Sequence, residues 1–424
     1  MKTHEVFGIS PTVNEHSYVD RGHLDKTLAT ILGRTTHLAI RGPSKCGKSW
    51  LRQKALANPI TVQCRLQKPF TDIYVDALSQ LDIKIQVKES KQGSFQASVS
   101  AKGEAGAALL AKAGIKGTLG HDSSTSTDSK TVGHDINDLR FVADIINKSE
   151  RRLVIEDFHY MSPSDRRAFS FDLKALWDYN TFVVIIGVWS ETNLLLFLNP
   201  DLSGRVQEMS IEWSDTDLDG ILTKGGRTLN IDFDPAYRKK LVSLSYSNAG
   251  LLQQLTLLSL DDAKITESGF LKQNVTDTTH VDNASMAHAE QLKPVYQQFA
   301  KTTAAGVRSR ANSTGIYAHT MAVIMEASDE ELIRGLKAKV IFDRANKRQS
   351  RIQQANLKSI LEKIPELQVD DGGRGLIIDY SPATEEVTIV DRQLLLYRKY
   401  STVKWPWEDL IAEADAKGGQ VDAG

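Results

Sequence analysis

The chain has 424 residues, 52 of them basic and 53 acidic, and 41% are hydrophobic. This length exceeds one ordinary core, so two or three domains are expected. The balanced charge excludes a strong field of the whole chain toward nucleic acid or membrane, so any basic surface must be local. Only two cysteines are present, Cys46 and Cys64, which excludes a disulfide framework.

No targeting or membrane segment is expected. The N-terminal stretch MKTHEVFGISPTVNEHSYVDR lacks the apolar region of a secretory signal. The longest apolar runs, such as residues 182–189, are too short to span a bilayer. Because two cysteines also suit a reducing compartment, we expect a cytoplasmic protein without a membrane partner.

Short apolar segments with the character of buried strands alternate with helical segments along the first half of the chain. This alternation predicts an α/β fold with a mostly parallel sheet and right-handed crossovers. The expected strands are residues 37–41, 60–64, 152–155, 181–188 and 206–211, and the expected helices are residues 23–32, 49–57, 71–81, 136–147, 163–178 and 191–198.

Residues 82–134 differ in composition and interrupt the α/β pattern. Two runs of alternating apolar and polar residues, 83–87 and 95–101, flank the sequence KQGS, which is typical of a hairpin. A stretch of small residues and a serine-rich stretch follow. We interpret this segment as an insertion, which is either a contact surface for DNA, a neighbouring protomer or an effector, or a tolerated surface excursion.

The sequence GPSKCGKS, residues 42–49, stands between the first expected strand and a helix and matches G-x-x-x-x-G-K-[ST]. Gly42 and Gly47 allow the backbone to wrap around a phosphate, while loop amides and the helix start supply donors. Lys48 can reach the β- and γ-phosphates, and the Ser49 hydroxyl can ligate Mg²⁺. The predicted nucleotide-binding residues here are Gly42, Pro43, Ser44, Lys45, Cys46, Gly47, Lys48, Ser49 and Trp50.

An acidic pair follows a later strand. Residues 152–155 are an apolar segment that ends in Glu156 and Asp157. Such a pair suits a magnesium and water site, because one carboxylate can orient the metal shell while the other polarises the attacking water. The sequence therefore predicts ATP and Mg²⁺ as ligands and hydrolysis of ATP to ADP and phosphate as the reaction.

The motifs GPSKCGKS and LVIEDFHY resemble the Walker A and Walker B motifs of AAA+ and STAND P-loop ATPases, over residues 15–260. The resemblance implies a P-loop parallel sheet with a helical lid. It implies Glu156 at the magnesium position, as a metal ligand with Ser49, and Asp157 at the water-activating position. Similar AAA+ proteins carry aspartate and then glutamate, so the order is inverted here, and the shorter Asp157 suggests slow hydrolysis by a switch.

The resemblance implies three further residues of the catalytic and nucleotide-binding site. Arg21, in YVDR, takes the place of the box that packs beside the adenine. The strand at 181–188 takes the place of the sensor-1 strand, and we prefer Ser190 over Asn193 as its polar group, with a helix cap at Ser190 as the alternative. Arg205 takes the place of an arginine finger that serves a neighbouring subunit, unless it is an ordinary surface arginine.

The lid also departs from the pattern. The sequence NAGLL, residues 248–252, lacks the sensor-2 arginine of many AAA+ lids. This departure favours the STAND-like or transposon-regulator type. We expect an ATPase core at 1–213, a helical lid at 214–260, a polar linker at 261–285 and a helical, winged-helix-like domain at 286–424.

The C-terminal third combines a basic helix with strand-like segments. We expect a helix over 350–364 that ends at Pro365, then strands at 367–369, 376–380 and 387–390, an order that resembles a winged helix. Residues 337–363 hold eight basic and two acidic residues, so the helix could rest on DNA or present a basic face to protein. The candidate DNA contacts are Lys347, Arg348, Arg351, Gln354, Lys358 and Arg374.

Three hypotheses for the function remain open. The first is an ATP-driven switch that assembles with itself into a ring or filament and recruits or regulates an effector protein, as in bacterial antiphage defence or a mobile element. The second is an ATPase that loads on or remodels double-stranded DNA through the C-terminal winged helix. The third is a nucleotide-binding scaffold without catalysis, which the inverted acidic pair keeps open.

Overall fold

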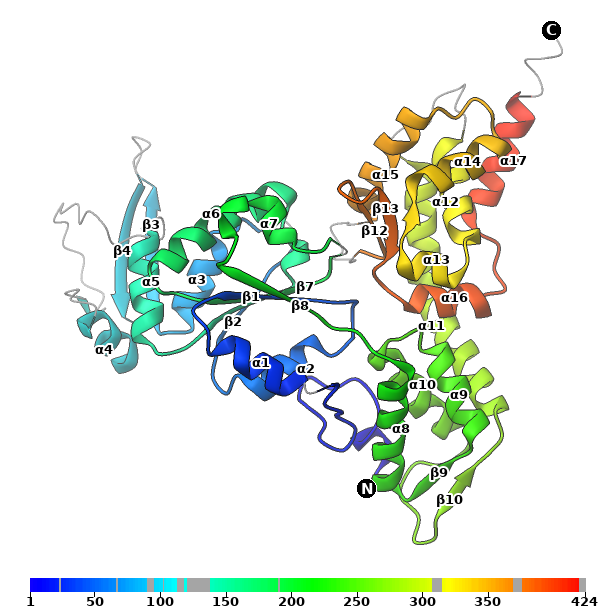
Figure 1. Ribbon diagram of the computed structural model, residues 1–424, viewed down its shortest axis with the longest axis horizontal. Helices are drawn as coiled ribbons and strands as arrows, with labels where there is room; N and C mark the ends of the chain where they lie inside the picture. The colour runs from blue at the N-terminus through cyan, green and yellow to red at the C-terminus, as the bar shows by residue number, and fades with distance from the viewer. Residues whose placement is uncertain are drawn as a thin grey trace.

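The computed structural model describes most of the chain (Figure 1). The described residues are 1–22, 24–65, 68–89, 95–101, 103–112, 118–119, 138–189, 191–306, 315–368 and 376–418. For residues 85–100, 118–119 and 414–418 the description concerns the backbone alone. Within these residues no helix is both long and apolar enough to cross a bilayer.

A five-stranded sheet forms the centre of the N-terminal half, in the order β2-β6-β7-β1-β8. Its strands are β1 (His37–Arg41), β2 (Ile60–Gln63), β6 (Leu153–Glu156), β7 (Val183–Gly187) and β8 (Val206–Ser210). All four pairings are parallel. The predicted α/β fold is confirmed, and the carboxyl ends of β1, β6 and β7 meet at one edge, where ligands of such sheets bind.

Helices cover both faces of this sheet (Figure 1). The helices of the first half are α1 (Leu24–Leu32), α2 (Lys48–Ala55), α3 (Asp72–Ser79), α5 (Leu139–Lys148), α6 (Pro163–Asp178) and α7 (Leu194–Leu198), with 3-10 turns η1 (Thr3–Glu5), η2 (Phe158–Tyr160) and η3 (Pro200–Leu202). Side chains alternate across β1: Leu38 and Ile40 pack with α1 and α2, whereas Ala39 joins the core under α3, α5, α6 and α7. Local signals explain α6, because Ser162 accepts the Asp165 amide and Pro163 occupies the first turn.

The segment that interrupts the α/β pattern forms a sheet of its own, in the order β3-β4-β5. Its elements are β3 (Ile83–Glu89), β4 (Phe95–Ala101), α4 (Glu104–Lys112) and β5 (Thr118–Leu119). β3 and β4 pair antiparallel from Ile83 opposite Ala101 to Glu89 opposite Phe95, as the alternating pattern predicts. The KQGS turn at 91–94 lies outside the described residues.

The second half is helical, and one hydrophobic core joins residues 218–260 to residues 281–407. Its first group is α8 (Asp215–Leu229), α9 (Pro235–Leu244) and α10 (Ala249–Asp262), with the parallel pair β9 (Ile231–Phe233) and β10 (Gln273–Val275). The second group is α12 (Ile316–Glu326), α13 (Asp329–Arg334), α14 (Ala338–Arg348), α15 (Gln354–Gln368), α16 (Gln393–Tyr400) and α17 (Pro406–Gly418). α11 (Thr279–Ala305) packs against α10 and α16 and so connects the two groups, while residues 261–285 contain β10 and the start of α11.

A three-stranded sheet, in the order β11-β13-β12, is formed by one strand before α14 and two strands after α15. Its strands are β11 (Leu336–Lys337), β12 (Ile378–Ser381) and β13 (Glu386–Ile389). The expectation that Pro365 ends the preceding helix was wrong, because α15 continues to Gln368 where a strand had been expected from residue 367. The Gln368 side chain explains this, since it accepts the amides of Ile377 and Ile378 and donates to the Ile378 carbonyl at 2.8–2.9 Å.

Candidate active site

The loop between β1 and α2 needs its glycines. A Cβ atom at Gly42 would lie 2.9 Å from Cys46 Sγ and 3.0 Å from the Ile211 carbonyl oxygen. Gly47 has φ 90°, in the left-handed region, and Lys45 also has a positive φ of 61°. Both predicted glycines therefore serve the tight wrapping of the loop.

Five consecutive carbonyls of this loop, Gly42 to Cys46, are paired with donors. Lys48 Nζ donates to the carbonyls of Gly42, at 2.9 Å, and Pro43, at 2.6 Å. From α10, Asn248 Nδ2 donates to the Ser44 carbonyl at 2.7 Å, and the Gly250 amide donates to the Lys45 carbonyl at 3.0 Å. Carbonyl oxygens repel an anion such as phosphate. Because these hydrogen bonds hold the loop carbonyls toward protein donors, the carbonyls do not oppose an anion bound by the loop.

The Cys46 carbonyl accepts two bonds, from Arg21 Nη1 at 3.2 Å and from Trp213 Nε1 at 2.8 Å. The Arg21 guanidinium also stacks over the Trp213 ring at 4.0 Å. Arg21 is 7% exposed, and burial lowers its pKa. Sequence analysis placed Arg21 beside the nucleotide, but it did not identify Trp213, whose only sequence signal is an aromatic residue after the last strand of the sheet.

The start of α2 presents donors to the same region. The first N–H groups of a helix have no partner within it. Gly47, at the helix start, has no side chain that could accept them. The first turn of α2 can therefore bind an anion, as the motif predicts.

The acidic pair lies opposite this loop, at the end of β6. Glu156 is 7% exposed, and its Oε1 accepts Arg52 Nε at 3.1 Å and lies 3.0 Å from Arg52 Nη2. Asp157 follows in the left-handed conformation, with φ 57°. Burial, and next the Glu156 charge, raise the pKa of Asp157, whereas Lys48 opposes this shift. Arg52 was not identified from the sequence, although it stands one helical turn after Lys48.

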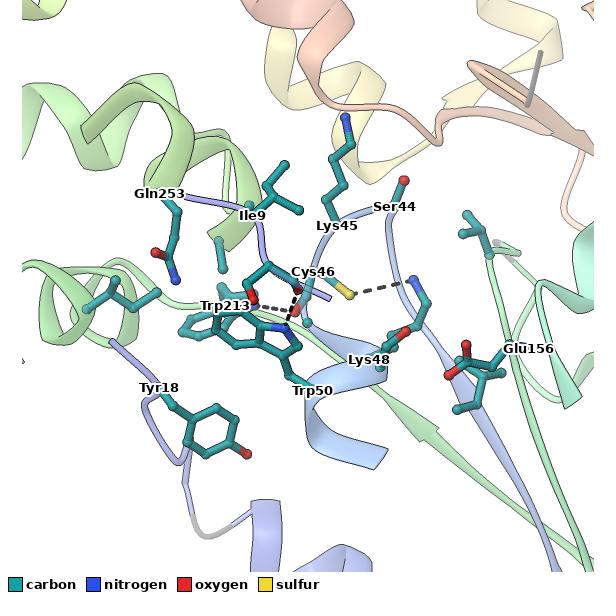
Figure 2. A pocket seen from close by; sticks show the side chains of 18 of the residues that line it. Ile9, Tyr18, Ser44, Lys45, Cys46, Lys48, Trp50, Glu156, Trp213 and Gln253 are labelled. Atoms are coloured by element: carbon teal, nitrogen blue, oxygen red, sulfur yellow. Dashed lines mark hydrogen bonds between the residues drawn. The ribbon is translucent and has the colours of Figure 1, made fainter. Parts of the chain in front are cut away.

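These groups line a cavity of about 270 Å³. Figure 2 shows Lys48 and Glu156 on one side of the loop, and Tyr18 and Gln253 on the other. Its lining includes the mainly apolar residues Ile9, Tyr18, Val19 and Ile221, which suit a base, and the residues Lys48, Ser49, Glu156, Asp157, His159 and Tyr160, which suit phosphates. We call the side of Tyr18 and Gln253 the apolar end and the side of Lys48 and Glu156 the phosphate end. The cavity thus has the apolar and the charged end that a nucleotide requires.

Ser49 and Glu156 fit a magnesium site. Mg²⁺ usually keeps several waters and takes one or two protein oxygens together with phosphate. Both residues line the phosphate end and also a second, polar cavity beside it. Since both contacts of Arg52 are to Oε1, the Glu156 Oε2 atom is left for a metal-bound water. Elsewhere in the described part of the chain, no group of three His, Cys, Asp or Glu side chains could hold a metal.

The two other predicted catalytic residues are Ser190 and Arg205. Ser190 falls outside the described residues. Arg205 does not line the cavity of its own chain. Its Nη1 donates to the Asp201 carbonyl, and its guanidinium stacks over Trp177 at 4.8 Å. An arginine that serves a neighbour would lie outside its own site, but this one also has partners within its own chain.

The C-terminal group contacts the loop directly. The Ser44 amide donates to the Val390 carbonyl at 3.4 Å. Arg392 Nη1 donates to the carbonyls of Tyr246, at 2.8 Å, and Ser247, at 3.1 Å, immediately before the Asn248 cap of α10. Figure 1 shows β12 and β13 on the side of this group that faces the parallel sheet. The loop, α10 and the segment after β13 are therefore joined by hydrogen bonds.

The predicted DNA-contacting residues are brought to one region, but not all have free charges. Lys347, Arg348, Arg351, Gln354 and Lys358 are exposed on α14, on α15 and between them. Arg348 pairs with Glu326, and Lys358 Nζ lies 2.7 Å from Glu385 Oε1. Arg374 lies outside the described residues. Two of the expected cations are thus already opposed by carboxylates.

No protein-family model and no curated protein sequence matches the chain. Among solved structures it is similar to the Orc1 protein of Aeropyrum pernix, solved in complex with DNA, with 12% identity and a TM-score of 0.41 over 90% of this chain and 93% of that one. It is also similar to a Pyrococcus horikoshii STAND protein with a tetratricopeptide repeat sensor, with 12% identity and a TM-score of 0.37 over 96% of this chain and 45% of that one.

A third similar structure is the RuvB Holliday junction branch migration motor of Thermotoga maritima, with 10% identity and a TM-score of 0.35 over 90% of this chain and 96% of that one. At these values the likeness concerns the fold alone. The P-loop fold itself follows from β1, the Gly42–Ser49 loop and α2 in a parallel sheet.

Proposed function

We propose that this chain binds ATP with Mg²⁺, hydrolyses it slowly and acts as a switch that assembles with itself and regulates a partner. The observation that carries the ATP site is the loop whose five carbonyls, from Gly42 to Cys46, are paired with donors. The loop amides other than that of Ser44, and Lys48 once it leaves the Gly42 and Pro43 carbonyls, can then bind phosphate at the charged end of the cavity. Mg²⁺, held through Ser49 and Glu156, would screen the phosphate charge.

The chain's own residues suggest how hydrolysis proceeds. Lys48 exchanges its bonds to the Gly42 and Pro43 carbonyls for phosphate oxygens. Arg52 holds Glu156 in place. Asp157 lies at the phosphate end, and its raised pKa makes it a stronger proton acceptor than an exposed aspartate. Asp157 is therefore the residue we assign to the attacking water.

Measuring phosphate release distinguishes hydrolysis of ATP from nucleotide binding alone. Phosphate release by the full chain should be lost in Asp157→Asn while nucleotide binding persists, because the amide keeps the shape but cannot accept the proton. Lys48→Ala should lose both. If the wild type binds ATP and releases no phosphate above the Asp157→Asn variant, the chain is a non-catalytic scaffold.

Two observations support a switch. The Val390 and Arg392 contacts join the C-terminal group to the loop and to α10, so a change at the phosphates can reach that group. Arg205 lies outside its own cavity, as a residue that completes a neighbour's site would. We propose a ring or filament whose effector is a separate protein, in antiphage defence or a mobile element.

Assembly is tested by measuring particle mass with and without a non-hydrolysable ATP analogue. We expect larger assemblies with the analogue, and their loss in Arg205→Ala. Arg34→Ala is the matched control, because Arg34 is an exposed arginine whose Nη1 donates to Gln207 Oε1 of β8, the strand that follows Arg205. A wild-type monomer under both conditions would contradict self-assembly and leave the ATPase proposal standing.

A DNA-directed ATPase is the second candidate. It is favoured by the order of α14, α15, β12 and β13, a helical pair followed by a hairpin as in a winged helix, and by exposed Lys347, Arg351 and Gln354. The ion pairs of Arg348 and Lys358 weigh against it. Salt-dependent duplex binding that weakens on charge reversal of Lys347, Arg348 and Arg351 would support this candidate.

A further inference from the structure

His159, two residues after Asp157, lines the cavity together with the acidic pair. The left-handed turn at Asp157 leads directly into η2, which carries Phe158, His159 and Tyr160. This turn brings His159 to the end of β7, where a Cβ atom on Gly187 would lie 3.3 Å from the His159 amide nitrogen. His159, Asp157 and Lys48 all line the cavity.

One hydrogen bond determines which ring nitrogen carries the proton. The Val188 amide donates to His159 Nδ1 at 3.3 Å, so Nδ1 is the acceptor. A neutral imidazole then carries its proton on Nε2. Burial, and next the charges of Lys48 and Arg166, lower the pKa of His159 to about 3. The ring is therefore neutral at physiological pH, a donor through Nε2 and not a base.

The Nε2–H group is available to a ligand. In the part of the chain that the structure describes, no hydrogen-bond partner of Nε2 is found, and the ring is half-buried in the cavity wall. The Tyr160 ring lies against the His159 ring, with centroids 4.3 Å apart and planes tilted by 36°, and so restrains its orientation. The remaining donor is thus held in place by one backbone bond and one aromatic contact.

The position along the cavity identifies the phosphate that this donor can reach. The apolar end holds Tyr18, Val19 and Gln253, and Lys48 with the start of α2 follows. Asp157, His159 and Val188 line the same cavity from the carboxyl ends of β6 and β7, and the Lys48 charge acts on both Asp157 and His159. A nucleotide whose base occupies the apolar end therefore directs its terminal phosphate toward His159.

We propose that His159 is a specificity-determining residue that donates a hydrogen bond from Nε2–H to the terminal phosphate of a bound nucleoside triphosphate. This inference rests on the proposed nucleotide site. It predicts that His159 favours the triphosphate over the diphosphate, because only the triphosphate reaches it. A charge-assisted bond in a restricted site makes this preference measurable.

Two substitutions separate this role from support of β7. In His159→Asn the short amide can still accept the Val188 amide but cannot place a donor at the ε position. In His159→Gln the longer amide can place its N–H group near the position of Nε2. The Asn variant thus keeps the structural bond and loses the phosphate donor, whereas the Gln variant retains the donor.

The test is equilibrium binding of ADP and of a non-hydrolysable ATP analogue, both with Mg²⁺, to the full chain. We expect His159→Asn to weaken the affinity for the ATP analogue roughly 10-fold and to change the affinity for ADP less than about twofold. His159→Gln should stay within about threefold of wild type for both ligands. Equal weakening of ADP and analogue in the Asn variant, or no weakening of either, would overturn the inference. A wild type that binds neither ligand would instead refute the proposed nucleotide site.

Discussion

Two cationic regions of the molecule, the P-loop and the surface of α14 and α15, differ in where their charges are directed. At the P-loop, Lys48 and the first turn of α2 converge on a cavity that also holds Glu156 and Asp157. On α14 and α15, Arg348 and Lys358 are exposed and face carboxylates of their own chain. A surface cation with a partner contributes little, whereas convergent donors at a cavity can bind an anion. The four predictions below test this difference.

The largest effect should come from Lys48. We expect Lys48→Ala to weaken binding of an ATP analogue about 100-fold, because a charged hydrogen-bonding group at the phosphates is lost. Lys293→Ala on α11 is the control, since Lys293 pairs with Glu290 at 2.7 Å and does not line the cavity. Calorimetric titration measures both, and similar affinities for the two variants would contradict the assignment.

A smaller effect is expected at Gly250, where α10 meets the loop. A Cβ atom there would lie 2.7 Å from both the carbonyl oxygen and the Cβ atom of Lys45. Gly250→Ala should push α10 away, break the bond to Lys45 and weaken nucleotide binding about 10-fold.

The control for this variant is Gly220→Ala on α8, where the added Cβ would meet Val19 at an ordinary 3.6 Å. Alanine in that helix should slightly stabilise the protein and leave nucleotide affinity unchanged. A Gly250→Ala variant that binds nucleotide like the control would show that the contact between α10 and the loop is dispensable.

A third prediction concerns Asp379 of β12. Burial, and next the Glu191 charge, raise the pKa of Asp379 to about 7, while Arg166 opposes the shift. Because this folded-state pKa exceeds the ordinary value of about 3.9, the stability linked to Asp379 is complete below pH 4 and is lost as the pH rises through 7.

Asp379→Asn should therefore reduce the loss of stability between pH 5 and pH 8, by about 1–3 kcal/mol in urea unfolding. Asp144→Asn, at an exposed position on α5, is the control and should leave the pH dependence as in wild type. If both variants lose as much stability as wild type between pH 5 and pH 8, burial and the Glu191 charge do not raise the pKa of Asp379, and the prediction is wrong.

The smallest effect is expected on α14 and α15. Charge reversal of Lys347, Arg348 and Arg351 should change duplex DNA affinity less than about threefold at physiological salt, because Arg348 already has an acidic partner. Binding at several salt concentrations measures this. A large loss of affinity with a reduced salt slope would remove the contrast between the two regions and favour the DNA-directed candidate.

Local sequence signals predicted much of the fold. The features that were predicted wrongly depend on contacts between residues far apart in the sequence. The helix α6 was expected at its observed bounds, because Ser162 and Pro163 mark its start and its apolar face is regular. Pro365 misled the interpretation, since a single proline was outweighed by the Gln368 bonds to a strand that comes later in the chain.

The same division applies to the site. The loop and the acidic pair are contiguous motifs, so Lys48, Ser49 and Glu156 could be identified from spacing. Trp213 and Gly250 act on the loop from more than a hundred residues away, and no local pattern marks them. Arg52 carries a weak local signal, because it follows Lys48 by one helical turn, but its partner Glu156 is brought near only by the sheet.

The contact between Ser44 and Val390 bears on how the protein is made. The loop is made before residues 200–390, and its partner carbonyl belongs to Val390. Domains generally fold in the order of synthesis, so the parallel sheet can form while residue 390 is still unmade. During that interval the Ser44 amide has water as its partner. The nucleotide loop therefore reaches its finished environment only after Val390 has been made and has folded against it.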